Sequence, residues 1–207
     1  MTTVRKQLGA TVNDIVLATL GGGLARYMRR HGYDTEGVTL RVLCPVSMRR
    51  TDEHGALGNL VSMVSVGIDA GTSDPLDRLQ GVRAEMQTLK ADDQAGGLYD
   101  IAAVVKALPA PLFALPWRHL PRTYWPHNIT STNVAGPRTP LYLAEHELLH
   151  WYPVGVQWTD NALFLCALSY REYLVLGLVA DPNVVPDVWE ANEDLRAAYE
   201  ELREAAG

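Results

Sequence analysis

Apolar residues recur at the spacing of an amphipathic α-helix between residues 11 and 30. The apolar stripe consists of Val12, Ile15, Val16, Leu20 and Leu24. Thr11 is suited to cap this helix, and Asp14 three positions later completes a capping box near the positive end of the helix dipole. Three glycines at 21–23 weaken the helix late in its course. They indicate either a close contact with another helix or a break.

Two further segments have helical character. Asp74 and Pro75 open the first of them, because proline suits the first turn of a helix. Its apolar positions keep helical spacing, and charged residues fall between them. These apolar residues are Leu76, Leu79, Val82, Met86 and Leu89, and the charged ones include Arg78, Arg83 and Glu85. The last predicted helix covers residues 186–205 and has a face rich in glutamate and arginine.

The remaining apolar runs are short and typical of strands. They cover residues 38–46, 60–68, 127–134, 155–158, 162–170 and 173–179. Residues 98–126 differ from them, because five prolines at this density allow only short helices. Strands interspersed with helices predict a layered α/β domain with a mixed sheet and flanking helices.

Composition narrows the class of protein. With 207 residues, 47% hydrophobic and 20% charged, the chain suits one globular domain or two small ones. The net charge of −6 and the scattered arginines argue against a nucleic-acid partner. Cys44 and Cys166 lie in apolar runs, which predicts buried thiols in a reducing compartment. With no leader-like start and no apolar run of about 18 residues, we expect a cytoplasmic protein.

One short motif matches a metal signature. His146, Glu147 and His150 form HELLH, an HExxH pattern that binds zinc when it lies on a helix. This segment lies between Pro140 and Pro153 and leads into strand-like runs, so we expect a strand or hairpin. On a strand the two imidazoles stand about 13 Å apart, too far for one ion. A zinc hydrolase is therefore a remote alternative, and we assign no metal ligands.

Two polar clusters have both a structural and a functional interpretation. Residues 129–133 end in Ser131, Thr132 and Asn133, and Gly136-Pro137 follow. A strand end of this kind can present donors to a developing oxyanion, but a strand closed by a tight turn is the simpler interpretation. That turn gives Gly136 the role of supplying permissive backbone angles. Asn13 and Asp14 at a helix start are ordinarily part of a cap.

The order of these motifs resembles a known family. The segment ATVNDIVLA at residues 10–18 is similar to the ATVNDVVLA segment of bacterial wax ester synthase/diacylglycerol acyltransferases. NVAGP at 133–137, then Leu141-Tyr142 and YPV at 152–154, resemble that family's NVPGP, LY and YPV succession. The closing pattern also matches, through Ser169-Tyr170, Gly177, Asp181 and Val185-Pro186-Asp187. The resemblance covers nearly the whole chain and implies the C-terminal half of such an enzyme.

The resemblance implies one half of a chloramphenicol acetyltransferase-like layered sandwich. In this family an HHxxxDG motif in the N-terminal half supplies the base, and acyl-CoA is a substrate rather than a cofactor. The present chain has six histidines, but none are adjacent and none precede xxxDG. We therefore expect a chain that lacks catalytic residues and is inactive alone. It would be a truncated product, an excised half or one piece of a split gene.

Roles for individual residues follow from the same resemblance. Asn13 and Asp14 match the family's ND pair and would brace the pocket, whereas Ser131, Thr132 and Asn133, with Gly136 and Pro137, would bind substrate. The expected partners are the HHxxxDG half, in cis or in trans, acyl-CoA and a lipid acceptor. Residues 98–126 would border an acyl tunnel, contact a membrane or lipid body, or form a buried connection. A non-catalytic lipid-binding or scaffold protein of the same fold is the alternative function.

Overall fold

The computed structural model describes residues 2–47, 61–92, 127–157 and 161–207. The helices are α1 (Thr2–Leu8), α2 (Val12–Arg30), α3 (Pro75–Ala91) and α6 (Val188–Ala205). The strands are β1 (Thr39–Ser47), β2 (Val61–Asp69), β3 (Ile129–Ala135), β4 (Tyr142–Leu143), β5 (His146–Glu147), β6 (Leu163–Tyr170) and β7 (Tyr173–Ala180).

Five strands form one mixed sheet in the order β2-β1-β3-β6-β7. β3 lies in the centre and is parallel to both of its neighbours, β1 and β6, whereas the two outer pairs are antiparallel. Strands β4 and β5 form a separate two-stranded hairpin. The predicted α/β fold with a mixed sheet is therefore confirmed.

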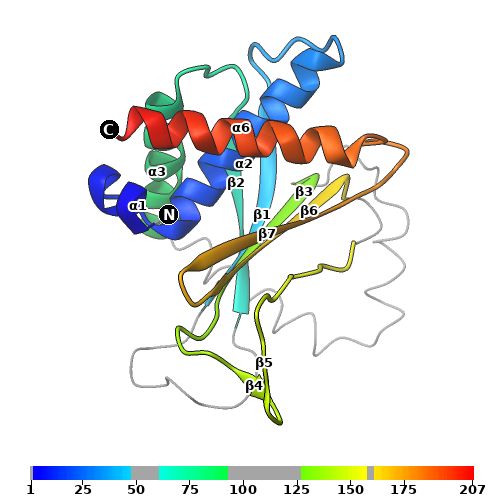
Figure 1. The fold of residues 1–207 in the computed structure, drawn as a ribbon. Coiled ribbons are helices and arrows are strands. Elements are labelled where there is room, and N and C mark those ends of the chain that lie inside the picture. The colour runs from blue at the N-terminus through cyan, green and yellow to red at the C-terminus, as the bar shows by residue number, and fades with distance from the viewer. Residues whose placement is uncertain (1, 48–60, 93–126, 158–160) are drawn as a thin grey trace, which may run out of the picture.

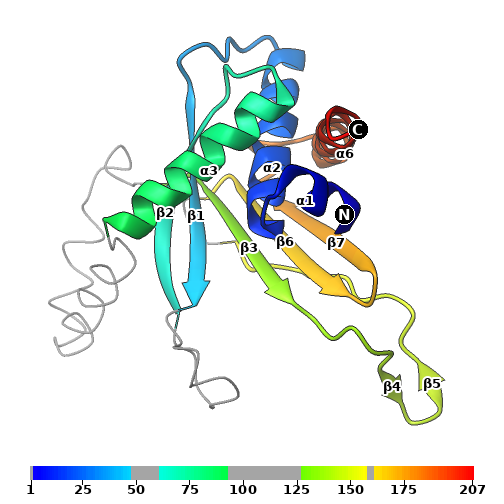
Figure 2. The same ribbon diagram turned by 90° about the vertical axis from the view of Figure 1, so that its left-hand side faces the viewer.

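The helices cover one face of the sheet, so the core lies between them and the strands (Figures 1 and 2). Alternate residues of the strands point into this core, as the period of two in a strand requires. Val42, Val66 and Leu165 are each fully buried there. No described helix packs on the opposite face, and this leaves the centre of the sheet open to other segments.

Helix α2 begins as the sequence predicts. The Thr11 hydroxyl accepts a hydrogen bond from the Asp14 amide at 3.2 Å, and the Asp14 carboxylate accepts one from the Thr11 amide at 2.8 Å. The helix continues through the three glycines without a break. The glycines instead allow a close helix contact, because a Cβ on Gly23 would lie only 2.7 Å from the Leu195 Cα of α6. Of the two expected outcomes, the close contact is the correct one.

Replacing Gly23 by alanine is expected to destabilise the protein by about 1–3 kcal/mol, because the new methyl group meets the α6 backbone. Gly81 is the matched control, since a Cβ there meets nothing within 4 Å. Gly81→Ala is expected to stabilise the protein by about 0.5–1 kcal/mol. Urea unfolding followed by circular dichroism measures both changes. Equal stabilisation by both substitutions would contradict the close contact between α2 and α6.

Arg78 departs from the pattern that its neighbours on α3 indicate. Its side chain is buried, although it belongs to the charged positions between the apolar stripe. Its guanidinium donates to the carbonyl oxygens of Ala18, Thr72 and Ser73 at 3.0, 3.2 and 3.3 Å. Burial lowers the pKa of this guanidinium. Arg78 therefore ties α3 and the loop before it to α2.

Two further differences from the sequence predictions concern local elements. Helix α1 was not predicted, and its seven residues offer no long apolar period. Residues 155–157 do not form a strand, although residues 155–158 have strand-like composition. The proline-rich stretch at 98–126 lies outside the described residues. Of the described helices, none has the length and the apolar character needed to cross a bilayer.

Candidate functional site

The polar side chains at the end of β3 divide between the two faces of the sheet. In the parallel register Ser131 lies opposite Leu165, a residue of the helix-covered core. Thr132 lies opposite Cys166, and successive side chains of a strand point to opposite faces. Asn133 thus shares the helix-covered side with Ser131, and Thr132 belongs to the open face. The three residues predicted to bind substrate together do not share one surface.

A pocket of about 340 Å³ lies on the open face of β3 and β6. Its floor is made mainly by residues of β3 and β6 that point to the open face, together with Ala167 between them, and its roof by residues 151–155, called here the roof segment. The floor consists of Thr132, Val134, Phe164, Cys166, Ala167 and Leu168. The roof consists of Trp151, Tyr152, Pro153, Val154 and Gly155. This lining is mainly apolar and suits an apolar ligand better than a charged one.

Two glycines let the roof segment lie close to the sheet. A Cβ on Gly155 would overlap the Phe164 ring and lie 2.9 Å from the Cys166 sulfur. A Cβ on Gly177 of β7 would overlap the carbonyl oxygen of Pro153. The YPV and Gly177 positions of the sequence pattern are therefore in contact. Together they shape the pocket.

Neither thiol is suited to nucleophilic chemistry. Cys166 borders the pocket, but burial raises the pKa of its thiol. Cys44 lies in the core, where burial raises its pKa to about 12. Because the thiolate is the reactive form of cysteine, the raised pKa values disfavour nucleophilic reactivity at both positions. Both cysteines are free and buried, as predicted.

Gly136 and Pro137 hold the end of β3 to the β6–β7 turn. The Gly136 amide donates to the Ser169 hydroxyl at 3.1 Å, and the Arg171 amide donates to the Pro137 carbonyl oxygen at 3.0 Å. Gly136 does not have a positive φ, so the prediction that it supplies permissive angles is wrong. It is needed because a Cβ there would overlap the carbonyl oxygen of Ser169.

Asn13 and Asp14 lie in the first turn of α2, on the helix-covered side of the sheet. Asp14 is buried and its carboxylate accepts the Thr11 amide of the capping box. Asn13 is half-buried. Neither residue lines the pocket on the open face. Their cap accounts for the local geometry, and their role in bracing a substrate pocket stays a prediction.

The HELLH segment forms an exposed hairpin rather than a helix. His146 and Glu147 make up β5, and the side chains of all three motif residues, including His150, are exposed. Glu147 accepts a hydrogen bond from Arg171 at 2.7 Å. The helical spacing that brings two imidazoles to one ion is therefore absent. Within the described ranges, a three-residue group that could hold a metal ion occurs instead where α2 meets α6.

Residues 138–157, called here the arm, carry an exposed apolar surface beside the pocket. The β4–β5 hairpin of the arm extends away from the five-stranded sheet (Figure 2), whereas the roof segment near the end of the arm lies against β6 and β7. Its exposed apolar side chains are Leu141, Tyr142, Leu143, Leu149, Trp151, Tyr152, Val154 and Val156. The buried Tyr170 hydroxyl fixes the base of the arm, because it accepts from the Leu141 amide and donates to the Leu148 carbonyl. Apolar patches of this extent mark interaction surfaces.

Solved structures share this fold. A wax ester synthase/diacylglycerol acyltransferase from Marinobacter aquaeolei VT8 matches 99% of the chain with a TM-score of 0.74 at 22% identity. The first condensation domain of the CDA synthetase matches 99% with a TM-score of 0.58 at 13% identity. The chain covers 46% and 42% of these two chains. The architecture is thus that of one half of an acyltransferase- or condensation-type fold.

The sequence comparisons give the family. Residues 57–203 match the family model described as the WS/DGAT C-terminal domain. A putative diacylglycerol O-acyltransferase of Mycobacterium tuberculosis is 31% identical over 98% of the chain. The O-acyltransferase WSD of Acinetobacter baylyi is 31% identical over 88% of it. The chain belongs to the WS/DGAT C-terminal domain family, as the order of its motifs predicted. It spans 44% and 39% of the length of these two relatives.

Sequence analysis did not find the pocket-lining residues of β6, and it singled out residues 152–154 of the roof segment only as part of the family pattern, not as a pocket wall. The signal was present in LFLCALSY at 163–170, where strand alternation places Phe164, Cys166 and Leu168 on one face. The roof could not be found this way, because residues 151–155 have no regular structure. Only the approach of Gly155 and Gly177 in space brings them to the sheet.

Proposed function

We propose that this chain is the C-terminal half of an O-acyltransferase that moves an acyl group from acyl-CoA to diacylglycerol or a long-chain alcohol. The products would be a triacylglycerol or a wax ester. The observation that carries the proposal is the apolar pocket of about 340 Å³ on β3 and β6, which is continuous with an exposed apolar arm. The names of the relatives support the reaction class.

The reaction needs a base, and this chain has no HHxxxDG motif to supply it. The acceptor hydroxyl oxygen attacks the thioester carbonyl carbon, a base takes the hydroxyl proton, and the carbon–sulfur bond breaks to release the CoA thiol. An imidazole is suited to this proton transfer. We assign it to an HHxxxDG-containing N-terminal half, present in cis or in trans. Acyl-CoA is the donor substrate, and we propose no further cofactor.

The pocket is suited to the acyl tail. Each buried methylene contributes about 0.8 kcal/mol, so even a few of them in this apolar lining bind measurably. Thr132 offers a hydroxyl within the pocket. Asn133 is exposed next to Val134 at the pocket wall, so the end of β3 joins an apolar surface to a polar one. We assign the thioester carbonyl to this end, with Gly136 and Pro137 holding the strand end in place, Ser131 supporting it from the buried face and the Asn13-Asp14 turn as more remote support.

A bulky residue at the pocket wall is expected to weaken binding of the acyl chain. Val134 lines the pocket and is 51% exposed, so Val134→Phe narrows the cavity with little effect on the core. We expect about tenfold weaker binding of a fluorescent sixteen-carbon acyl probe, which corresponds to about 1.4 kcal/mol. Val184→Phe is the matched control, because Val184 is 58% exposed and lies outside the pocket. Equal affinity in both variants would exclude this pocket as the acyl site.

The arm is proposed to meet the N-terminal half. Leu143 and Val154 are more than four-fifths exposed, an unusual state for large apolar side chains on a protein surface with no partner. Contact with a lipid surface is the competing use of the same side chains. We propose a cytoplasmic protein, peripheral at a membrane or lipid body when it meets its acceptor. Aspartate substitutions in the arm distinguish the two uses, since they abolish complementation only if the arm binds the other half.

A further inference from the structure

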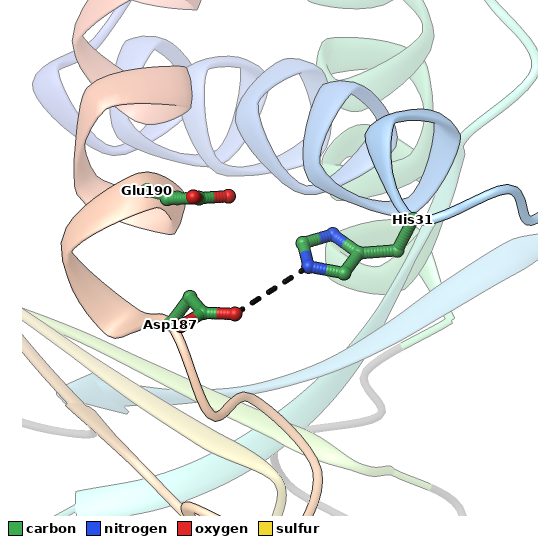
Figure 3. Close-up of side chains that lie close together, drawn as sticks. All are labelled: His31, Asp187 and Glu190. Carbon is green, nitrogen blue, oxygen red and sulfur yellow. Dashed lines mark ion pairs between the residues drawn. The ribbon is translucent and has the colours of Figure 1, made fainter.

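Three potential metal ligands converge where the end of α2 meets the start of α6. His31 is the C-cap of α2, Asp187 is the N-cap of α6, and Glu190 lies in the first turn of α6. One ligand atom from each residue, an imidazole nitrogen and two carboxylate oxygens, lies within 4.8 Å of the other two. Figure 3 shows the imidazole and both carboxylates directed towards the same space.

The imidazole of His31 is held with one nitrogen free for a ligand. Its Nδ1 lies 2.9 Å from the carbonyl oxygen of Tyr27, and a carbonyl oxygen only accepts. In the neutral ring Nδ1 therefore carries the hydrogen, and Nε2 keeps a lone pair. Nε2 lies 3.7 Å from the Asp187 carboxylate. In metal-binding histidines, the ring nitrogen that does not bind the metal usually donates to a carbonyl or carboxylate oxygen, which fixes the tautomer.

Asp187 is the N-cap of α6, but its side chain does not cap the helix. An aspartate at an N-cap normally accepts hydrogen bonds from amides of its own first turn. The Asp187 side chain makes no such bond. Its carboxylate instead points to His31 (Figure 3). Asp187 therefore does not stabilise the start of α6 through its side chain, which contacts His31 at the end of α2 instead.

A buried phenol lies beside the cluster, and the backbone amide of Asp187 faces its oxygen. Tyr27 is 7% exposed, and its ring packs on His31 with 4.2 Å between the centroids. Burial is the largest cause that raises its pKa; the amide of Asp187 counteracts it, and the carboxylates of Asp187 and Glu190 add to the increase. A phenol O–H can donate a hydrogen bond to a metal-bound water or to a carboxylate, so the ring that packs on His31 brings a neutral donor to the cluster.

Glu190 can leave its ion pair with Arg30 and bind a metal ion with little loss of stability. Its present partner is Arg30, at 3.4 Å, and both side chains are more than two-fifths exposed. Exposed pairs of this kind contribute about 0–1 kcal/mol. Arg30 also contacts the buried carboxylate of Asp194 at 2.6 Å. The guanidinium therefore keeps its stronger partner when Glu190 turns to a cation.

We propose that His31, Asp187 and Glu190 form a binding site for one zinc ion, which joins the C-terminal end of α2 to the N-terminal end of α6. Zinc accepts nitrogen and carboxylate oxygen ligands at about 2.0–2.2 Å, so neighbouring ligands stand about 3.3 Å apart in a tetrahedron. The His31–Asp187 separation is already close to this value. Small side-chain rotations bring Glu190 into place, and water completes the coordination.

The test is a zinc titration of the 207-residue chain by calorimetry, with the metal content measured after gel filtration. We expect one zinc ion per chain and a melting temperature that rises with zinc concentration, as for any ligand of the folded state. Loss of a ligand in His31→Ala or Glu190→Gln is expected to weaken binding about tenfold or more. The double variant His146→Ala/His150→Ala is the matched control and should bind zinc normally.

Each other outcome overturns the proposal. Absence of stoichiometric zinc in the wild type would show that the three residues form only ion pairs. Zinc lost in the His146→Ala/His150→Ala variant and kept in His31→Ala would move the site to the arm. Glu190→Gln keeps the shape of the side chain, so unchanged affinity in this variant would also exclude the site even if His31→Ala were to unfold.

Discussion

Addition of a separately expressed HHxxxDG-containing half is expected to raise CoA release from palmitoyl-CoA and a long-chain alcohol from background to clear turnover. The 207-residue chain alone is expected to show none, because its six histidines include no HHxxxDG motif. A well-placed general base contributes about 10²–10⁴-fold to the rate, which sets the scale of the effect. A thiol-release assay with the chain, the other half and their mixture measures it.

The same titration reports on the arm. Binding of the other half to the folded chain should raise its melting temperature with the concentration of the added half. Leu143→Asp is expected to abolish both the temperature rise and the turnover, since it places a charge on the exposed apolar surface outside the pocket. Val184→Asp is the control, because Val184 is exposed outside the arm. Turnover by the chain alone would mean that one of its own histidines is the base.

A temperature rise without turnover would favour the non-catalytic alternative, in which the chain binds lipid or serves as a scaffold. The pocket makes that alternative concrete, because an apolar lining binds an acyl chain whether or not a base is present. Binding of the acyl probe would then be retained in the isolated chain. Asn13→Ala and Asp14→Ala, which remove the ND pair, should reduce turnover in the mixture only if the pair supports catalysis.

Local signals predicted those parts of the fold that depend on neighbouring residues. The Thr11–Asp14 box marked the start of α2 because both of its hydrogen bonds join residues three positions apart. The apolar period of α3 was visible for the same reason. Helix α1 and the two-residue strands β4 and β5 were too short to show a period. Burial of Arg78 involves the Ala18 carbonyl oxygen of α2, 60 residues away in sequence, and no local pattern indicates it.

In the candidate sites, too, local patterns were visible in the sequence, whereas contacts between distant residues were not. The order of motifs identified the family, and strand alternation then divided Ser131 and Thr132 between two faces. HELLH was visible because it is local, yet it lies on a hairpin. His31 and Asp187 are far apart in the sequence and have no spacing that a motif search recognises. They meet only because α2 and α6 pack closely at Gly23 and Leu195.

Replacing the buried Arg78 by alanine is expected to lower the free energy of unfolding by about 3 kcal/mol. The substitution removes a guanidinium that packs on Gly22 and donates to three carbonyl oxygens. The carbonyl groups of Thr72 and Ser73 lose a charged donor, and the space above Gly22 is left empty. Urea unfolding followed by circular dichroism measures the change.

Two further variants separate the causes of that loss. Arg78→Met restores much of the packed volume without the hydrogen bonds, so it is expected to lie between the wild type and Arg78→Ala in stability. Arg83→Ala is the control on the same helix, because the Arg83 guanidinium is only half-buried and makes a single 3.4 Å contact with the Leu8 carbonyl. It is expected to cost less than about 1 kcal/mol. If Arg83→Ala were as costly as Arg78→Ala, the junction between α3 and α2 would not depend on the buried guanidinium.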